Sequence, residues 1–334
     1  MSQRHVLITG AGMVGTSTAR ELLADGWRVT LVDRTMPRDY VREVLGDEAL
    51  AEGGPVSLIE VDLTDQAGRA AAFDGLRVDA VVHTAALIAA RAQRDLLETL
   101  SVNVEVPLWL AGWAAAAGAS RFVPISSWSV FAEDQPGPIT EDSPLMMHFT
   151  SYYIASKLAT EHLLSAYAAS SGLQVAVIRP TVVYGYGPNL GGSVGSAAIE
   201  AQVLRGVRGE SIEVPANIIS TTELVYAGDV GRAVAAAVTV PMEGVFTWFT
   251  IGSQETTTIE ELAATLREVF PGVAVTVGTG SEFSVVPPKQ SVPTDLTETL
   301  RALGIPTPLR RREGFERFAE ELRQAEVLAA GGSR

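Results

Sequence analysis

The chain has 334 residues, of which 47% are hydrophobic and 19% are charged. That content is enough for a large buried core and is unlike the composition of a disordered chain. The net charge of −14 repels phosphate backbones and anionic lipid headgroups, so we expect neither nucleic acid nor a membrane as a partner. Because the chain has no cysteine, it has no disulfide, no thiolate zinc ligand and no cysteine nucleophile.

The strand-like and helix-like patterns alternate along the first half of the chain. Residues 5–9 form a short β-rich run, and the helical pattern after the glycines ends at Gly26. Further strand-like runs lie at 28–33, 56–62, 78–84, 121–127 and 174–180, and two long helical patterns lie near 94–117 and 150–171. Strands rich in Val, Ile and Leu that alternate with helices indicate a parallel sheet covered on both faces. The sequence therefore predicts an α/β fold, a Rossmann-type doubly wound parallel sheet of about seven strands.

The pattern changes after Pro180, where a glycine-rich loop at 185–195 is followed by shorter, mixed elements. We therefore predict a dinucleotide-binding domain over 1–180 and a smaller substrate-binding α/β lobe over 181–334. One strand near 246–252 is placed to return to the large sheet.

Metal and membrane sites are not indicated. The four histidines do not have the spacing of a zinc site, so we expect no metal. No stretch approaches ~20 uninterrupted apolar residues, the length that spans a bilayer. The N-terminal segment lacks the longer apolar core and cleavage site of a signal peptide. We therefore expect a cytoplasmic protein.

The glycine motif after the first strand predicts a dinucleotide site. Gly10, Gly12 and Gly15 form a G-x-G-x-x-G that encloses Met13 and Val14 and opens a helix. In this arrangement the glycines allow the tight turn, the approach of a pyrophosphate and the packing of helix on strand, while the helix start supplies amide donors. The structural alternative is an ordinary tight turn.

Asp33 ends the second strand, 18 residues beyond Gly15, where an acid binds the ribose hydroxyls of NAD. A carboxylate at this position repels the 2′-phosphate of NADP. Arg34, the next residue, could contact that phosphate or the adenine. We expect NAD to be the cofactor.

These motifs and their order resemble the extended short-chain dehydrogenase/reductase family, the group of NAD-dependent epimerases and dehydratases. The resemblance covers nearly the whole chain and implies further cofactor contacts. They lie in VDLTD (61–65), HTAA (83–86), SVNVEVPLWL (101–110), RPTVVYGYGP (179–188) and DLTETLRALGIPTP (295–308). The implied cofactor residues in the first four are Asp62, Leu63, Thr84, Ala85, Ala86, Asn103, Pro180 and Val183.

Two departures from the family pattern matter. The first loop is one residue shorter than the family's T-G-x-x-G-x-x-G, so we expect NAD binding with a slightly altered turn. Sugar-nucleotide members usually carry an arginine before the segment that reads TTELVYAGDV (221–230) here, and this chain has none there. The second departure argues against a nucleotide-sugar substrate.

The segment YIASK matches the family's Tyr-x-x-x-Lys and ISSWSVF its serine segment. Tyr153 and Lys157 lie one helical turn apart, which is also compatible with a simple exposed pair. The resemblance implies that Tyr153 transfers the substrate proton, that Lys157 stabilises the phenolate and binds the nicotinamide ribose, and that Ser127 binds the substrate oxygen. We expect the ammonium and the nicotinium charge to lower the tyrosine pKa by ~3 units. Tyr152 lacks a cation at i+4 and is the weaker candidate.

The remaining candidates are assigned with alternatives. We interpret His83 as a turn residue rather than a catalytic one, and His148 either touches substrate or lies in an exposed loop. The apolar residues Trp128, Met146 and Met147 form either a substrate wall or ordinary packing. The predicted substrate residues are Trp128, His148, Asn189, Ser193 and Thr222.

The sequence therefore predicts an enzyme with a small-molecule substrate. Our main interpretation is an NAD-dependent dehydrogenase that acts on a secondary alcohol of a sugar, sugar acid or polyol. The alternative is a sugar or nucleotide-sugar epimerase that retains NAD, and a non-catalytic NAD-binding regulator is the third reading. By resemblance, the helices near 94–117 and 150–171 pair in a homodimer.

Overall fold

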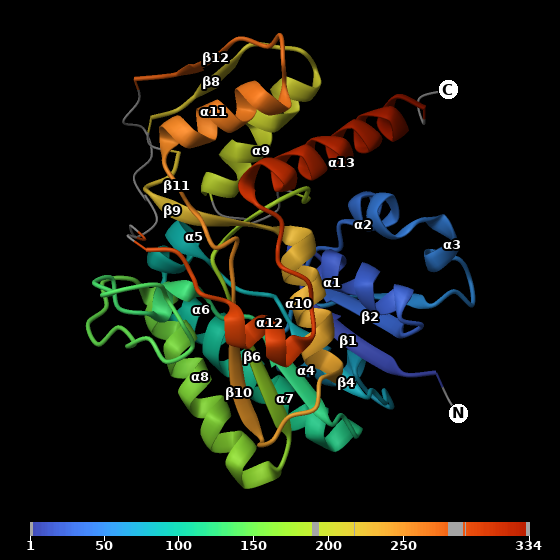
Figure 1. The fold of residues 1–334 in the computed structure, drawn as a ribbon. Coiled ribbons are helices and arrows are strands. Elements are labelled where there is room, and N and C mark those ends of the chain that lie inside the picture. The colour runs from blue at the N-terminus through green and yellow to red at the C-terminus, as the bar shows by residue number, and fades with distance from the viewer. Residues whose placement is uncertain (1–2, 189–193, 217, 280–289, 291, 332–334) are drawn as a thin grey trace.

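The computed structural model describes residues 3–188, 194–216, 218–279, 290 and 292–331. Its centre is a seven-stranded parallel sheet with the order β10-β6-β5-β4-β1-β2-β3 (Figure 1). The strands are β1 (His5–Thr9), β2 (Arg28–Asp33), β3 (Val56–Glu60), β4 (Ala80–His83), β5 (Arg121–Pro124), β6 (Gln174–Pro180) and β10 (Phe246–Ile251). The predicted doubly wound sheet and its strand number are confirmed.

The strand order reverses at β1, which lies between β2 and β4. In the parallel register Thr9 is level with Val32 on one side and with His83 on the other. The carboxyl ends of these three strands therefore meet at one edge of the sheet. In open α/β sheets this point of reversal is where a crevice forms for a ligand.

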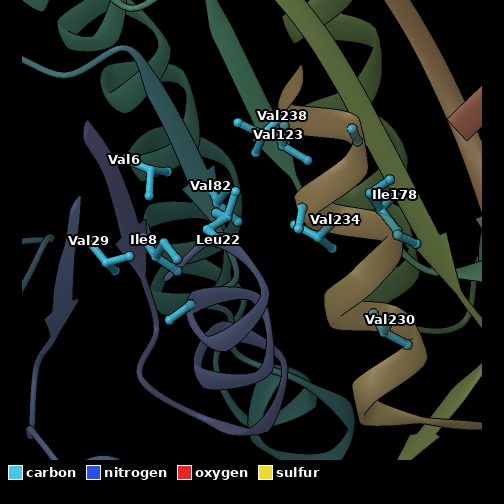
Figure 2. Packing of buried hydrophobic residues seen from close by; sticks show 14 of the residues in the cluster. Val6, Ile8, Leu22, Val29, Val82, Val123, Ile178, Val230, Val234 and Val238 are labelled. Carbon is cyan, nitrogen blue, oxygen red and sulfur yellow. The ribbon is translucent and has the colours of Figure 1, made fainter. Parts of the chain in front are cut away.

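The sheet is covered on both faces, and alternate residues of each strand point to opposite faces. Val6 and Ile8 belong to one apolar cluster, shown in Figure 2, whereas Leu7 belongs to the other. The helices on the first face are α1 (Met13–Ala24), α2 (Arg38–Leu45), α10 (Ala227–Thr239) and α12 (Thr297–Leu303). The helices on the second face are α4 (Gln66–Ala72), α7 (Val106–Ala117) and α8 (Tyr152–Ser171).

The part of the chain after residue 181 contributes to this large layer. Strand β10 pairs with β6 along its whole length, and α10 lies against α1. The close approach of these helices depends on Gly231, because a Cβ there would come within 2.7 Å of Ser17. Sequence analysis assigned only a strand near 246–252 to this return. We propose that the dinucleotide-binding domain comprises residues 1–180 together with α10, β10 and α12.

The other elements after residue 181 build a second layer at one end of the sheet (Figure 1). They surround a core of their own, which includes Val203, Leu224, Leu266 and Phe318. The strands are β7 (Val182–Tyr184), β8 (Ile212–Val214), β9 (Thr222–Tyr226), β11 (Thr256–Thr257) and β12 (Val275–Val277). The helices are α9 (Val194–Val207), α11 (Ile259–Val269) and α13 (Arg311–Gly331). We propose this layer as the substrate lobe.

The helical pattern near 94–117 is not one helix. It comprises α5 (Ala89–Arg94), α6 (Leu96–Leu100), a π-helical turn η1 (Ser101–Glu105) and α7. The break after α5 occurs at Asp95, which is extended and whose carboxylate caps α6 by accepting from the amides of Leu97 and Glu98. The short helix α3 (Asp47–Leu50) and the 3₁₀ turn η2 (Trp128–Val130) complete the described elements. No helix among the described residues is long and apolar enough to cross a bilayer.

Candidate active site

A cleft of about 1240 Å³ opens at the carboxyl edge of the sheet, below the second layer. Its walls come from the ends of β1, β2, β4, β5 and β6, from the start of α8, and from Gly195–Ala197 at the start of α9. The predicted site residues that line it are Gly10, Gly12, Met13, Val14, Asp33, Arg34, Asp62, Leu63, Thr84, Ala85, Ala86, Ser127, Trp128, Tyr153, Lys157, Pro180 and Val183. Segments that lie far apart in the chain thus meet in one cavity.

The glycine loop fits a dinucleotide pyrophosphate. Gly10 has φ +90°, and a Cβ there would lie 2.4 Å from the Thr84 hydroxyl. Gly12 has nothing within 4 Å of an added Cβ, so the cleft is open beside it. Gly12 also precedes α1 without any side-chain cap, which leaves the first amides of that helix available to an anion. Gly15 does not line the cleft; its role is packing, since a Cβ there would lie 1.9 Å from the Gly10 carbonyl oxygen.

Asp33 is held at the end of β2 by the backbone around it. Its Oδ2 accepts from the Ala11 amide at 2.8 Å, and its Oδ1 accepts from the Thr35 amide at 3.1 Å. The carboxylate therefore faces the glycine loop and keeps lone pairs for ribose hydroxyls.

Arg34 is directed toward Asp62, with 3.8 Å between Nη1 and Oδ2. Burial disfavours the charged form of Asp62, yet hydrogen bonds from Thr64 and the Arg34 guanidinium hold its pKa below the ordinary value. The acid is therefore ionised at neutral pH, and the two acids and one arginine on this wall carry a net negative charge.

Side-chain hydrogen bonds hold the turn after β4 in place. The Thr84 hydroxyl donates to the carbonyl oxygens of Thr9 at 2.9 Å and Gly10 at 3.1 Å, which ties this turn to the glycine loop. His83 is buried, and its Nδ1 lies 2.6 Å from the Thr9 hydroxyl. Burial and the nearby Lys157 charge lower the pKa of His83 to about 3, so the imidazole is neutral. These contacts support the interpretation of His83 as a structural residue.

Asn103 does not line the cleft but connects two of its walls. It lies in the turn η1, buried, where its amide nitrogen donates to the Leu87 carbonyl at 2.8 Å and its Oδ1 accepts from the Leu87 amide at 2.8 Å. The same amide nitrogen donates to the Ser156 hydroxyl at 3.0 Å. Asn103 therefore ties the loop after β4 to the helix that carries Tyr153.

Ser127, Tyr153 and Lys157 line the same part of the cleft. Ser127 caps the turn η2, and its hydroxyl lies 2.8 Å from that of Ser129. Lys157 is buried and donates from Nζ to the Ile125 carbonyl oxygen at 2.8 Å. Its Nζ lies 5.7 Å from the centre of the Tyr153 ring.

The protein's own groups do not lower the pKa of Tyr153, and the lowering expected with the nicotinium charge of bound NAD stays a prediction. Burial raises the pKa of Tyr153 to about 12, and the hydrogen bond with Ser127 opposes this only in part. Burial also lowers the pKa of Lys157 to about 8, although the Glu161 carboxylate opposes that shift. With the protein's own groups the phenol is protonated at neutral pH, because desolvation outweighs the Ser127 hydrogen bond.

The other predicted substrate residues are dispersed. Trp128 lines the cleft and also packs against Phe131 and Ile139, and its contact with substrate stays a prediction. His148 is exposed and is not part of the cleft wall. Thr222 is completely buried in β9 and does not reach the cleft. Asn189 and Ser193 lie outside the described residues.

Met146 lines the cleft, whereas Met147 is 80% exposed and does not. Tyr152 is also exposed and is not part of the wall, as expected for the weaker of the two tyrosines. In the described part of the chain, His, Asp and Glu side chains form no group of three that could hold a metal.

Sequence reasoning missed several polar residues of the cleft. Ser129 is two residues beyond Ser127, and only the 3₁₀ turn brings the two hydroxyls together. Ser126 and Thr181 are buried cleft residues whose hydroxyls have no hydrogen-bond partner among the described residues. Arg91 and Glu133 are exposed and charged, and they had no motif that could have identified them.

A doubly wound parallel sheet, a glycine loop at its point of reversal and a Ser-Tyr-Lys cluster in the same cleft define an enzyme of the extended short-chain dehydrogenase/reductase class. The chain belongs to the NAD dependent epimerase/dehydratase family, whose model matches residues 6–252. NAD is therefore its cofactor.

Two relatives with assigned reactions show sequence similarity to this chain. The chain is 33% identical to a UDP-glucose 4-epimerase of Erwinia amylovora over 168 residues, 50% of this chain and 49% of that protein. It is 28% identical to a dTDP-4-dehydro-6-deoxy-D-allose reductase of a Streptomyces species over 276 residues, 80% of this chain and 81% of that protein. The chain thus spans about half the length of the first of these relatives and most of the second.

Solved structures match over nearly the whole chain. MoeE5 in complex with UDP-glucuronic acid and NAD has a TM-score of 0.76 at 27% identity, with 96% of this chain and 99% of that chain covered. The UDP-glucose 4-epimerase of Thermus thermophilus in complex with NAD has a TM-score of 0.76 at 26% identity and the same coverage. These similarities favour the epimerase alternative over the dehydrogenase that sequence analysis preferred.

Proposed function

We propose that this protein is an NAD-dependent epimerase of a sugar carried on a nucleoside diphosphate. The observation that carries the proposal is the presence of Ser127, Tyr153 and Lys157 in the same cleft as the glycine loop. The relatives named as UDP-glucose 4-epimerases support the choice of reaction.

We assign the cofactor to the residues that fit it. The first amides of α1, beside Gly12, would bind the pyrophosphate, and Asp33 would accept from the ribose hydroxyls. Lys157 would donate to the nicotinamide ribose. NAD, when bound, supplies the chemistry of hydride acceptance and return.

The proton chemistry is assigned to Tyr153. A phenol whose pKa is raised to about 12 holds its proton at neutral pH and has to be ionised before it can act as a base. Lys157 provides a cation 5.7 Å from the ring centre, and Ser127 provides a hydroxyl that stabilises the charged oxygen. Ser129, which is hydrogen-bonded to Ser127, would orient that hydroxyl toward the substrate oxygen.

Epimerisation requires that the oxidised sugar stays bound while it turns its other face to the hydride. A diphosphate tether outside the reacting ring allows this. Sequence analysis argued against such a tether because segment 221–230 has no preceding arginine. The start of α9 offers a substitute, because Gly195–Ala197 line the cleft and the first turn of a helix binds phosphate through its amides.

A single hydride transfer is the second candidate. It is favoured by the similarity to the dTDP-4-dehydro-6-deoxy-D-allose reductase, which extends over 80% of this chain. In that case NAD would exchange at every turnover and Tyr153 would transfer one proton to or from the product hydroxyl.

The two candidates differ in their products. The purified protein is incubated with UDP-glucose and, separately, with UDP-glucuronic acid, and the sugars are resolved by chromatography while NADH absorbance is followed. We expect 4-epimers to form without stoichiometric release of NADH. Tyr153→Phe should lower the rate by roughly 10²–10⁴-fold and leave NAD affinity nearly unchanged. Stoichiometric NADH with an oxidised sugar would instead identify a dehydrogenase.

A further inference from the structure

Arg91 is a cation in the cleft that the assignments above do not use. The cations that line the cleft are Arg34, Arg91 and Lys157. Arg34 lies near Asp62, and Lys157 donates to the Ile125 carbonyl oxygen. Within the ranges that the structure describes, the guanidinium of Arg91 makes neither an ion pair nor a hydrogen bond, and the side chain is exposed where it lines the cleft.

The helix that carries Arg91 is attached to the catalytic helix. Gln93, two residues further along α5, accepts from the Tyr152 amide at 3.1 Å and has its amide nitrogen 3.4 Å from the Thr150 carbonyl oxygen. Gln93 and Thr150 also line the cleft, as does Ser151, the cap of α8. Arg91 therefore lies on a helix that contacts the catalytic helix, and residues of both helices line the cleft.

The start of α9 forms another part of the cleft wall. Gly195–Ala197 at the start of α9 are uncharged and would bind a diphosphate through backbone amides, as proposed above. An oxyanion near Arg91 is therefore more readily a group of the sugar itself than the diphosphate. A guanidinium matches a carboxylate in shape because its parallel N–H groups meet both oxygens.

We propose that Arg91 binds a carboxylate on the sugar, so that the substrate is a nucleotide-linked sugar acid. This inference rests on the proposed function, since it assumes that a sugar ring lies beside Tyr153. The acids that line the cleft are Asp33, Asp62 and Glu133, and no described contact joins any of them to Arg91. Arg91 is thus a specificity-determining residue, and it selects the substrate through binding rather than through the chemical step.

The test measures binding and turnover separately. The NAD-loaded protein is titrated by calorimetry with UDP-glucuronic acid, UDP-glucose and UDP. We expect the wild type to bind UDP-glucuronic acid roughly 10- to 100-fold more tightly than UDP-glucose, as charged hydrogen bonds in a cleft commonly provide. Arg91→Gln should remove this preference and change the Kd of UDP-glucose by less than about twofold. Arg91→Lys keeps the positive charge but loses the paired N–H groups of the guanidinium, so it should retain part of the preference for UDP-glucuronic acid.

Arg94→Gln is the matched control, because Arg94 lies on the same helix but does not line the cleft. It should behave as the wild type. An equal loss of affinity for all three ligands in Arg91→Gln would show that the residue binds the diphosphate and would overturn the proposal. Equal affinity of the wild type for both sugars would also overturn it. If the preference depends on Arg91 but neither sugar is epimerised, the proposed reaction fails while this inference stands.

Discussion

At the scale of single residues, Lys157 illustrates how burial sets the chemistry of the cleft. The side chain is 6% exposed, and its pKa is lowered to about 8 chiefly by desolvation. A lowered pKa in a lysine means that the charge is present below about pH 8 and is lost as the pH rises through that value. The phenolate of Tyr153 therefore loses its nearest cation in mildly alkaline solution.

We accordingly predict that kcat/KM falls above about pH 8, with one ionisation. Lys157→Met should lower kcat/KM by roughly 10²–10⁴-fold and abolish this alkaline limb, because no titrating cation remains beside Tyr153. The pH profiles of both proteins with the same sugar nucleotide check this. A wild-type profile that stays flat to pH 10 would show that the charge of Lys157 is not required.

The same shift predicts a change in stability. The unfolded lysine titrates near pH 10.5 and the folded one near 8, so the unfolded state binds more protons between these values. The free energy of unfolding gains roughly 2–4 kcal/mol from this residue as the pH rises from 8 to 10.5. Denaturant titrations at the two pH values should give this increment in the wild type relative to Lys157→Met. An equal response of the two proteins would contradict the buried ammonium.

At the scale of the element, two glycines of the loop before α1 have different roles, one in ligand binding and one in packing. Gly12 has open cleft beside it and an ordinary φ of −86°, whereas Gly15 is pressed against the Gly10 carbonyl. An added methyl group at Gly12 therefore enters the space where NAD would bind, whereas at Gly15 it collides with the protein backbone.

We predict that Gly12→Ala weakens NAD binding by roughly tenfold or more, with the Tm within about 2 °C of the wild type, since the added methyl enters only the cleft. Gly15→Ala should lower the Tm by several degrees, because helix and strand have to move apart. Calorimetric melting and NAD titration of both variants check the pair. If Gly12→Ala melts early, the space beside it is not open.

At the scale of the whole molecule, two of the helices predicted to form a dimer interface carry exposed leucines. Leu97 is 76% exposed and Leu100 42% on α6, and Leu163 is 46% exposed on α8. Helices α6 and α8 are in contact within the chain, so these side chains belong to neighbouring elements. Exposed leucines on adjacent helices are compatible with a protein–protein interface.

We therefore predict a homodimer through α6 and α8. Light scattering should give twice the 35.3 kDa chain mass. The double variant Leu97→Glu/Leu163→Glu should give the mass of one chain, because it places carboxylates in an apolar contact. Val327→Glu, at a 71% exposed position on α13, is the control and should remain dimeric. A monomeric wild type would refute the assignment.

The sequence by itself determined the sheet, the glycine loop and the positions of Ser127, Tyr153 and Lys157. These features depend on local signals: apolar periodicity, glycines that follow a strand, and short motifs with fixed spacing. The ends of β1, β2 and β4 meet at one edge in any doubly wound sheet, so the cleft and its cofactor wall followed from the strand order.

Only the tertiary structure decided what depends on distant segments and on burial. Arg91, Ser129 and Thr181 reach the cleft because separate chain segments converge there, and no local pattern indicates it. Thr222, by contrast, is enclosed by the second layer. The burial that raises the pKa of Tyr153 depends on every neighbour that excludes water, whereas sequence spacing reveals only the lysine one turn away.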